Sequence, residues 1–218
     1  MSLHVLIPAR AGSAGVPDKN IRPLHGRRLI ERALGVALAL DPASITISTD
    51  YPADRLPPAC RPYRLARPAD LATSEAPMSG VLAHWAGQCA DLADDDTVVL
   101  LQTTSLHQDR AGLCRAVLRL PGRPAIAVDV VPNYWHAAYQ IDPEAPSAPP
   151  ARRQGLTARY RPNGAVYCLT GAQARTGALW GPPAPAWFLC APGSVITIDS
   201  PEDWRRALVA VAEWDRRT

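Results

Sequence analysis

Residues 9–20, which follow the first apolar run of the chain, carry most of its candidate chemistry. The segment combines two glycines and a serine with Arg10 and Lys19. Glycine and serine in a turn allow backbone N–H groups to face an anion, while the two cations neutralise its charge. The segment is therefore suited to bind a polyphosphate such as a nucleoside triphosphate, although an ordinary surface loop can have the same composition.

Lys19 is the only lysine among 23 basic residues, and the others are all arginine. A lone lysine in such a chain indicates a site that needs a compact ammonium with three rotatable donors. Chance survival under a codon bias is the alternative. The segment is neither a Walker A loop, because no G-K-[ST] ends it, nor a dinucleotide fingerprint, because G-x-G-x-x-G is absent.

The elements that must position this segment follow an alternating pattern. Short apolar runs alternate with longer stretches of helical period, which predicts a three-layer α/β/α fold with a mostly parallel sheet. The expected strands are residues 4–8, 44–49, 97–102, 125–130, 165–169 and 194–198. The expected helices are residues 29–40, 78–92 and 109–119, and a last one that follows Ser200.

The last helix has a clear start. Ser200 is suited to be its N-cap, Pro201 suits the first helical position, and Asp203 stands where a capping-box acid is expected. Its apolar face, which includes Trp204, is expected to dock on the sheet. Asp199 then lies between a strand and a helix, where open α/β sheets bind ligands.

Composition limits the kind of partner. With 218 residues, 47% of them apolar, the chain is expected to form one domain over residues 1–218. A net charge of +3 argues against nucleic acid and membrane surfaces as partners. No apolar run approaches the length needed to cross a bilayer, and no signal-peptide pattern opens the sequence. We therefore expect a cytoplasmic protein with a small-molecule substrate.

Other candidate groups suggest structural roles. The five cysteines lie far apart without a C-x-x-C pair, which argues against a disulfide framework or a zinc site, and we expect them to be buried. The histidines show no ligand spacing, and no G-x-S-x-G elbow is present. Asp50 is expected to cap a strand end. The run Asp94, Asp95 and Asp96 is expected to be a solvated turn.

Short blocks spread over nearly the whole chain carry a family resemblance. They are residues 7–13, 19–20, 24–26, 48–50, 67–72, 100–102, 104–105, 160–167 and 198–203. In their order and spacing the chain resembles the acylneuraminate cytidylyltransferases, which include the CMP-sialic acid synthetases and their relatives for other sugar acids. The block at residues 160–167 is the strongest of the set.

The resemblance implies a fold and a reaction. The fold would be that of the nucleotide-diphospho-sugar transferases. The reaction would be attack of a sugar-acid hydroxyl on the α-phosphate of CTP, with release of pyrophosphate and with Mg²⁺ screening the charge. The partners implied are CTP, an acidic sugar-like substrate and a second copy of the chain, with residues 131–154 as a dimerisation or loop insertion.

The resemblance also implies roles for residues on the nucleotide side. Arg10 and Lys19 would hold the triphosphate and Asp199 would bind the metal, and these three are the predicted catalytic residues. The remaining predicted nucleotide-binding residues are Ala9, Gly12, Ser13, Asn20 and Arg67. Arg67 followed by proline has an alternative interpretation, which is that it only ends a strand.

On the acceptor side, Gln102 follows a central strand and is predicted to touch the acceptor. Arg153 matches the family position that faces the acceptor carboxylate, where a planar guanidinium suits two oxygens. Asn163 and Tyr167 would line the same pocket. Their alternatives are that Asn163 belongs to a simple turn and that Tyr167 is a core residue.

Three departures from the family pattern affect this reading. Ala14 stands where the family usually has a lysine, and Thr197 replaces one of two aspartates that normally help to hold Mg²⁺. The acceptor-side segment at residues 103–108 loses two prolines and an arginine, which favours an unusual acceptor. Mg²⁺ often uses one or two protein carboxylates together with substrate phosphates, so Asp199 alone is compatible with catalysis.

The sequence therefore predicts a cytidylyltransferase acting on a sugar acid or a similar acidic hydroxyl compound. Two alternatives stay open. One is a degenerate homologue that binds nucleotide or sugar without turnover, as a binding or regulatory module. The other is a nucleotidyltransferase that uses a different nucleotide or a phosphonate-like acceptor.

Overall fold

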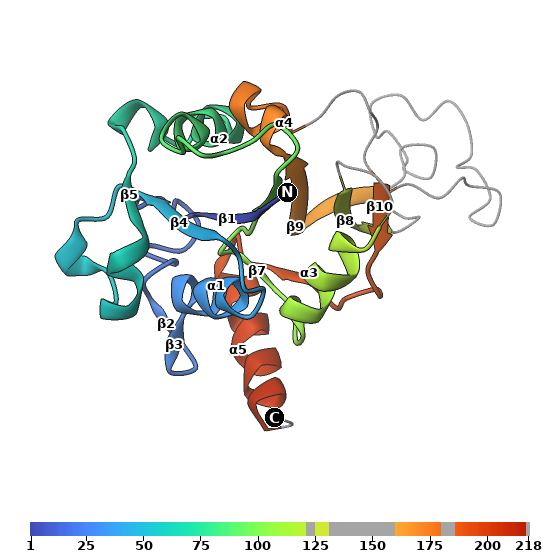
Figure 1. Cartoon of the computed structure of the whole chain (residues 1–218). Coiled ribbons are helices and arrows are strands. Elements are labelled where there is room, and N and C mark those ends of the chain that lie inside the picture. Colours follow the sequence, from blue (N-terminus) through green and yellow to red (C-terminus); the bar gives the residue numbers. More distant parts are fainter. Residues whose placement is uncertain (121–124, 131–159, 180–185, 217–218) are drawn as a thin grey trace, which may run out of the picture.

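A seven-stranded sheet forms the centre of the protein in the computed structural model, which describes residues 1–120, 125–130, 160–179 and 186–216 (Figure 1). The strand order is β10-β8-β9-β6-β1-β4-β5. Neighbouring strands are parallel except β9, which runs antiparallel to both β6 and β8. The strands are β1 (Leu3–Pro8), β4 (Ser44–Thr49), β5 (Arg64–Ala66), β6 (Thr97–Leu100), β8 (Ala125–Val130), β9 (Tyr160–Thr170) and β10 (Ala186–Leu189). The prediction of a mostly parallel sheet is confirmed.

Helices cover both faces of this sheet (Figure 1). Helices α1 (Leu29–Leu38) and α3 (Arg110–Leu118) pack on one face, where Val5 and Ile7 of β1 point. Helices α2 (Met78–Gly87) and α4 (Gly171–Thr176) pack on the other face, against Leu6. Successive side chains of β1 thus enter two different cores, one on each face of the sheet. This is the three-layer α/β/α fold that was predicted.

Helix α5 (Pro201–Asp215) begins as predicted but docks elsewhere. The Ser200 hydroxyl accepts from the Asp203 N–H at 3.2 Å, and the Asp203 carboxylate accepts from the Ser200 N–H at 2.9 Å. The expectation that its apolar face meets the central sheet is wrong. Trp204 instead packs in a separate cluster with Leu24, Leu106 and Ile196, which come from two small two-stranded sheets.

These two small sheets lie outside the central sheet. One pairs β2 (Pro23–Leu24) with β3 (Arg27–Arg28), and the other pairs β7 (Ser105–Leu106) with β11 (Ile196–Thr197). The strand expected at residues 194–198 is therefore only β11, and it lies outside the central sheet. Three short 3₁₀ helices, at Ala53–Arg55, Pro58–Tyr63 and Ala69–Leu71, connect β4, β5 and α2.

Several element ends differ from the predicted ones for local reasons. The helix expected to reach residue 40 ends at Leu38, because the chain turns into a left-handed conformation at Asp41, with φ 49°. The helix expected to reach residue 92 ends at Gly87, where Gln88 and Cys89 make shorter-range bonds back to Trp85 and Ala86. The expected strands at 97–102 and 165–169 are residues 97–100 and 160–170, and the helix at 109–119 is residues 110–118.

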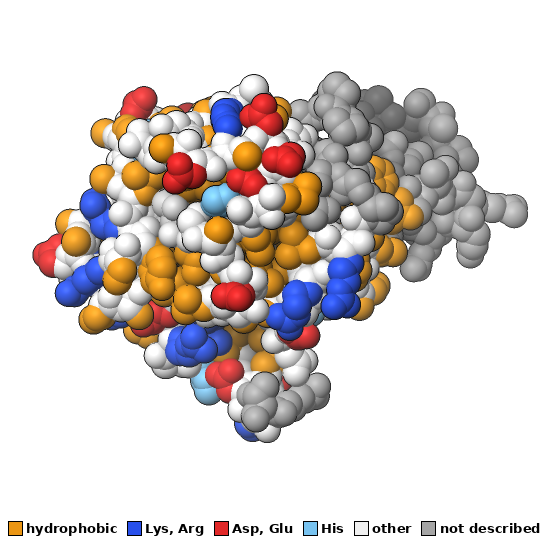
Figure 2. Space-filling view, in the orientation of Figure 1, with side chains coloured by type: hydrophobic (Ala, Val, Ile, Leu, Met, Phe, Trp, Pro, Cys, Tyr) orange, Lys and Arg blue, Asp and Glu red, His pale blue; other side chains and the backbone are white. Residues whose placement is uncertain are grey.

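Charged groups and cysteines are distributed largely as the composition suggested. Lys and Arg side chains lie at several separate places on the face shown in Figure 2 rather than in one patch. Cysteines 60, 114, 168 and 190 are buried as expected, whereas Cys89 is partly buried. Within the described ranges, no helix combines the length and the hydrophobicity that a membrane crossing needs.

Asp96 corrects the expectation of a solvated acidic turn. Its two neighbours Asp94 and Asp95 are exposed, but Asp96 is only 4% exposed. Its carboxylate accepts hydrogen bonds from the backbone N–H groups of Ser2 and Ala93 and lies 3.2 Å from Nε2 of His4. Asp96 thus ties the start of β1 to the turn before β6.

Asp96 is expected to give the fold an acid-sensitive contribution to stability. The hydrogen bonds from Ser2 and Ala93 lower the pKa of its carboxyl to about 2, against ~4 in an unfolded chain. Because the folded pKa is depressed, this contribution is complete above the unfolded pKa and disappears as the pH falls from about 4 towards 2. We expect Asp96→Asn to lower the melting temperature at pH 7 and to flatten its decline between pH 4 and 2, measured by circular dichroism. The exposed neighbour is the control, since Asp95→Asn should keep the wild-type profile, and an unchanged Asp96→Asn profile would contradict the prediction.

Candidate functional site

A pocket of about 370 Å³ lies beyond the carboxyl ends of β1 and β6, where parallel α/β sheets bind ligands. Residues 9–20, here called the β1 loop, form one wall, and the chain after β6 forms another. We call the cavity the β1-loop pocket. Its lining residues are Pro8, Arg10, Ser13, Ala14, Gly15, Lys19, Asn20, Arg67, Met78, Gln102, Thr103, Thr104 and Asp199.

The β1 loop is anchored to the end of β4. Asp50 accepts a hydrogen bond from the Ala11 N–H at 2.7 Å, which is the capping role expected of it. Farther along, Asp18 accepts from the Tyr51 hydroxyl at 3.1 Å and from the Arg55 guanidinium at 2.7 Å. The bond from Arg55 lowers the pKa of Asp18, so this carboxylate stays ionised. The loop is thus fixed at both ends, which limits the freedom of the residues between them.

Lys19 connects the β1 loop to the junction between β11 and α5. Its ammonium donates to the Ile198 carbonyl at 2.6 Å and to Oδ1 of Asp199 at 3.1 Å. The Lys19 side chain is 12% exposed, whereas that of Asp199 is 73% exposed. The two residues are 180 positions apart in the sequence, and the fold brings them into one ion pair at the pocket.

Gly15 lies directly against the same junction. A Cβ atom at this position would be 1.8 Å from the backbone oxygen of Asp199. Only glycine allows the loop to approach this closely, because any other residue would place a carbon inside the contact distance of a backbone atom. The β1 loop and Asp199 are therefore packed together through both side chain and backbone.

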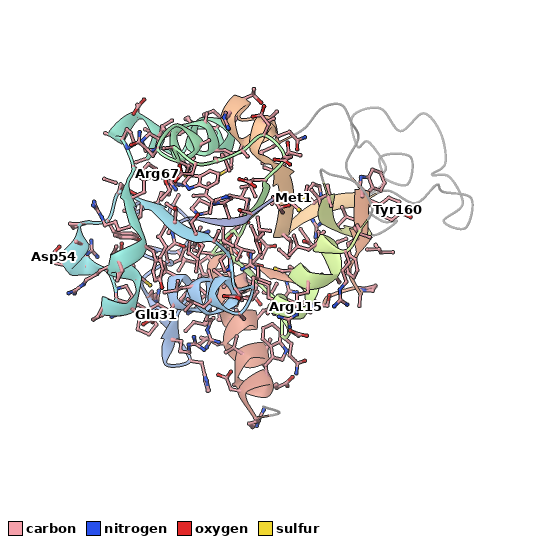
Figure 3. The ribbon with its side chains drawn as sticks, in the orientation of Figure 1. Met1, Glu31, Asp54, Arg67, Arg115 and Tyr160 are labelled. Carbon is pink, nitrogen blue, oxygen red and sulfur yellow. The ribbon has the colours of Figure 1, made fainter. Side chains whose placement is uncertain are left out.

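Arg10 and Arg67 bring positive charge to the pocket, and neither forms an ion pair with a described carboxylate. Arg67, labelled in Figure 3, is 7% exposed and donates to the hydroxyl of Ser48 at 3.2 Å and to its carbonyl at 2.8 Å. Burial lowers the pKa of Arg67, the negative charge of Asp50 opposes this shift, and the nearby charge of Arg10 adds to it. Arg10 donates to the Gly12 carbonyl at 2.9 Å. Neither guanidinium forms an ion pair within the part of the chain that the structure describes, so the pocket favours an anionic ligand.

Asn20 links the β1 loop to the chain that follows β6. It is 3% exposed, and its amide donates to the Arg10 carbonyl at 2.8 Å and accepts from the Thr103 hydroxyl at 2.5 Å. Both ends of the amide are therefore engaged by the protein itself. This arrangement holds the wall that carries Arg10 against the segment that follows β6.

The wall of the pocket that carries Gln102 depends on Gly164, whose φ of 74° is in the left-handed region. A Cβ there would lie 2.4 Å from Oε1 of Gln102 and 2.5 Å from the Ser105 hydroxyl. Asn163, just before it, is buried and donates to Asp129 at 3.0 Å. Its carbonyl accepts from the hydroxyl of Ser105 and from that of Thr197. Residues 163–164 lie within β9 and pack directly against Gln102, so the alternative that Asn163 belongs to a simple turn is wrong.

The structure brings most of the predicted site residues together. Those that line the β1-loop pocket are Arg10, Ser13, Lys19, Asn20, Arg67, Gln102 and Asp199. Ala9 and Gly12 belong to the loop but do not line the pocket, and the Ala9 N–H donates to the Ser48 carbonyl. Tyr167 and Asn163 are not brought to the pocket, since Tyr167 is 9% exposed and packs in the core on the α2 side. Arg153 and residues 131–154 lie outside the described residues.

Sequence reasoning missed Met78 as a pocket residue. It is the first residue of α2 and lines the pocket. No sequence signal near Met78 indicates a ligand, because its place in the site depends on how α2 crosses the sheet. Thr103 and Thr104 were noted only as a departure from the family pattern, yet both line the pocket.

The pocket offers limited but suitable oxygen ligands for a divalent cation. Asp199 is the one carboxylate among the lining residues, and no cluster of three or more metal-binding side chains occurs in the described ranges. Thr197, which stands at the family's second aspartate, donates to the Asn163 carbonyl at 3.2 Å. One exposed carboxylate fits Mg²⁺ when substrate phosphates provide further ligands.

Comparisons with known proteins agree with this geometry. A family model described as "Cytidylyltransferase" matches residues 4–54, which include β1, the β1 loop and β4. The CMP-N,N'-diacetyllegionaminic acid synthase of Legionella pneumophila is 26% identical over 219 residues, covering 94% of each chain. The chain is similar to a cytidylyltransferase over nearly its whole length. This bears out the family resemblance that the sequence blocks indicated.

A further relative and two solved structures extend the comparison. The 3-deoxy-manno-octulosonate cytidylyltransferase of Legionella pneumophila strain Corby is 40% identical over 50 residues, which cover 23% of this chain and 20% of the relative. A CMP:2-keto-3-deoxy-manno-octonic acid synthetase complexed with CTP aligns with a TM-score of 0.68 and 15% identity, over 98% of this chain and 99% of the other. A 4-diphosphocytidyl-2C-methyl-D-erythritol synthase aligns with a TM-score of 0.64 and 14% identity, over 96% and 98%. These structures show that the fold is that of the nucleotide-diphospho-sugar transferases, as predicted.

Proposed function

We propose that the protein transfers CMP from CTP to a hydroxyl group of a sugar acid and releases pyrophosphate. The observation that carries the proposal is the convergence of Arg10, Lys19, Arg67 and Asp199 on one pocket at the carboxyl ends of the parallel strands. The relatives named above act on a legionaminic acid derivative and on 3-deoxy-manno-octulosonate, which are both sugar acids. A sugar acid is therefore the acceptor class we propose for this chain.

The residues of the pocket suit the charges of this reaction. In the transfer, an acceptor oxygen forms a bond to the α-phosphorus, the bond from that phosphorus to the bridging oxygen breaks, and pyrophosphate leaves with the negative charge. Arg10 and Lys19 would stabilise the triphosphate and the charge that develops on the leaving group. Arg67 and Asn20 would fix the nucleotide, Gln102 would contact the acceptor, and Arg153 would bind its carboxylate.

We propose Mg²⁺ as the cofactor, with Asp199 as its protein ligand. The ion would screen the phosphate charge when bound. Asp199→Asn is expected to raise the Mg²⁺ concentration that gives half-maximal pyrophosphate release by roughly ten- to hundredfold, because a neutral amide replaces the one carboxylate of the pocket. The matched control is Glu202→Gln, which removes an exposed carboxylate three residues away. An unchanged Mg²⁺ requirement in Asp199→Asn would contradict the assignment of the metal ligand.

The oligomeric state and the location of the protein are also proposed. A homodimer is proposed from the resemblance, with residues 131–154 as the dimerisation insertion, and sedimentation of the full chain tests it. A cytoplasmic location is proposed because the CTP that the reaction consumes is a cytoplasmic nucleotide. Cell fractionation with an antibody against the protein tests the location.

The central experiment measures pyrophosphate release with Mg²⁺ from CTP, UTP, ATP and GTP across a panel of sugar acids. We expect release with CTP and at least one sugar acid, and little or none with the other nucleotides. Release with another nucleotide but not with CTP would overturn the assignment of the donor. Release from CTP with a phosphonate-containing acceptor, but with none of the sugar acids, would overturn the assignment of the acceptor.

A binding module without turnover is the second candidate, and one feature of the pocket favours it. Ala14 lines the pocket where the family usually has a cation, and Thr197 hydrogen-bonds to Asn163 where the family has a carboxylate. Calorimetry separates the two candidates. Binding of CTP without pyrophosphate release for any acceptor would support the binding module and contradict the transferase.

A further inference from the structure

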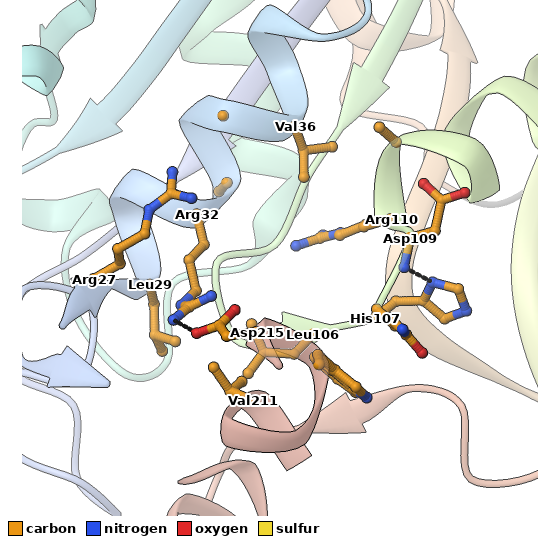
Figure 4. A pocket seen from close by; sticks show the side chains of 15 residues that line it. Arg27, Leu29, Arg32, Val36, Leu106, His107, Asp109, Arg110, Val211 and Asp215 are labelled. Carbon is orange, nitrogen blue, oxygen red and sulfur yellow. Dashed lines mark hydrogen bonds and ion pairs between the residues drawn. The ribbon is translucent and has the colours of Figure 1, made fainter. Parts of the chain in front are cut away.

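A second cavity, of about 360 Å³, is lined by residues of α1, α3 and α5 and by Leu106 of β7 (Figure 4). We call it the three-helix pocket. It shares no lining residue with the β1-loop pocket. Its occupant would therefore be a molecule other than the nucleotide and acceptor of the proposed function.

Arg110 brings a buried positive charge to this cavity. It is 5% exposed, and its Nε and Nη2 atoms both donate to the Ala165 carbonyl, at 3.0 and 2.7 Å. Burial lowers the pKa of Arg110 to about 10, so the guanidinium still carries its charge at neutral pH. Within the described part of the chain no carboxylate pairs with it, and Figure 4 shows its guanidinium directed towards the cavity.

Arg27 and Arg32 add two further guanidinium groups on the opposite wall. The Nε atom of Arg32 is buried and has no hydrogen-bond partner among the described residues, while its Nη2 donates to the Leu24 carbonyl at 3.0 Å. Burial lowers the pKa of Arg32, the negative charge of Asp215 opposes this shift, and the like charge of Arg27 adds to it. Arg27 forms no ion pair with a described carboxylate. The two walls thus face each other with excess positive charge.

The acidic and histidine side chains of the cavity neutralise only part of this charge. Asp109 caps α3 by accepting from the Gly112 N–H at 2.8 Å. Asp215 forms an ion pair with Arg32 at 3.8 Å and also contacts Nδ1 of His25 at 2.9 Å. The Nδ1 of His107 accepts from the Asp109 N–H at 3.1 Å. Three arginines therefore meet two carboxylates, and only Arg32 forms an ion pair with one of them in the described part of the chain.

The remaining lining is largely apolar and includes Leu29, Val36, Leu106, Val211 and Trp214. Such a wall suits the body of an organic molecule, while converging guanidinium groups suit an oxyanion. We propose that the three-helix pocket binds a phosphate monoester whose body has about the size of a sugar or a nucleoside. A dianionic phosphate matches cations on two walls better than a single carboxylate does, because it offers three acceptor oxygens.

Calorimetric titration of the full chain with phenyl phosphate tests the proposal. We expect one-to-one binding that weakens at least tenfold in Arg27→Gln and in Arg32→Gln, while Arg32→Lys retains more of the affinity than Arg32→Gln. Arg115 lies on α3 outside the pocket (Figure 3), and Arg115→Gln is expected to keep the wild-type affinity. Melting temperatures of all variants show whether they are folded.

Lys19→Ala separates this site from the β1-loop pocket. Unchanged phenyl phosphate binding in that variant supports the three-helix pocket, and it does so whether or not the proposed transferase activity is found. Loss of binding in Lys19→Ala alone would overturn the proposal, as would the absence of binding to the wild-type chain. Equal affinity for benzoate would overturn the choice of phosphate, and equal affinity for inorganic phosphate would overturn the role of the organic body.

Discussion

Replacing Lys19 with alanine is expected to lower kcat/KM for CTP by roughly 100- to 1,000-fold, which is typical of removing one preorganised electrostatic donor. The physical reason is twofold. The variant loses the ammonium that lies in the pocket, and it also leaves Asp199 and the Ile198 carbonyl without their contacts at 3.1 and 2.6 Å. Steady-state pyrophosphate release at varied CTP and fixed acceptor measures the effect.

Lys19→Arg is expected to recover little of this loss. The ammonium sits between a carbonyl and a carboxylate oxygen, and the side chain is 12% exposed. A planar guanidinium is larger and places its donors in a fixed fork, so it does not reproduce this geometry. Near-complete rescue by arginine would show that charge alone is needed and would contradict the argument from shape.

The matched control for Lys19 is Arg205→Gln, which removes one positive charge from an α5 side chain that is 70% exposed. An exposed charge of this kind contributes little to binding because water and salt screen it. We expect its kcat/KM to stay within about twofold of the wild type. A similar loss in both variants would mean that the net charge of the protein, rather than Lys19, controls CTP use.

The sequence allowed the Lys19–Asp199 neighbourhood to be predicted, because general rules place both residues. Lys19 belongs to the loop after β1, and Asp199 precedes a well-capped helix near the other end of the chain. Loops at the carboxyl ends of parallel strands meet on one edge of a sheet. The direct ion pair between them was not predictable, since it depends on the β7–β11 pair that positions residue 199 outside the central sheet.

For strand β9, the sequence does not predict which side chains face the site. Residues 163–169 of this strand are all buried, on both sides of the sheet. In a strand covered on both faces, apolar residues do not alternate with polar ones, so the pattern does not tell which side chains face the site. Tyr167 was therefore assigned to the acceptor pocket from resemblance, whereas the structure places it against Leu82 and Trp85 in the core cluster on the α2 side.

Sites that are assembled from several helices were not accessible to sequence reasoning either. The three-helix pocket joins α1, α3 and α5, and Arg110 appears in the sequence as one arginine among many. Its burial and its contact with Ala165 follow from the packing of α3 on β9. Periodicity predicts that α3 has an apolar face, but not which charged residue is enclosed at its start.

Gly15→Ala is the second variant with a large expected effect. The added Cβ would lie 1.8 Å from the backbone oxygen of Asp199, so either the loop or the β11–α5 junction must move. Overpacking of this kind costs about 1–3 kcal/mol of folding free energy. The effect on activity is expected to be larger, about 100-fold in kcat/KM, because a displacement of roughly 1 Å in a catalytic constellation has that consequence.

Gly87→Ala is the matched control for this substitution. A Cβ at Gly87, the last residue of α2, meets no atom within 4 Å. Alanine is the better helix former, so this variant should be as stable as the wild type or slightly more stable, with unchanged activity. Pyrophosphate release and melting temperature measured on both variants separate the two effects. If Gly15→Ala retained wild-type activity, the close contact between the β1 loop and Asp199 would not be needed for the reaction. The proposed grouping of triphosphate and metal ligands in one pocket would then lose its main support.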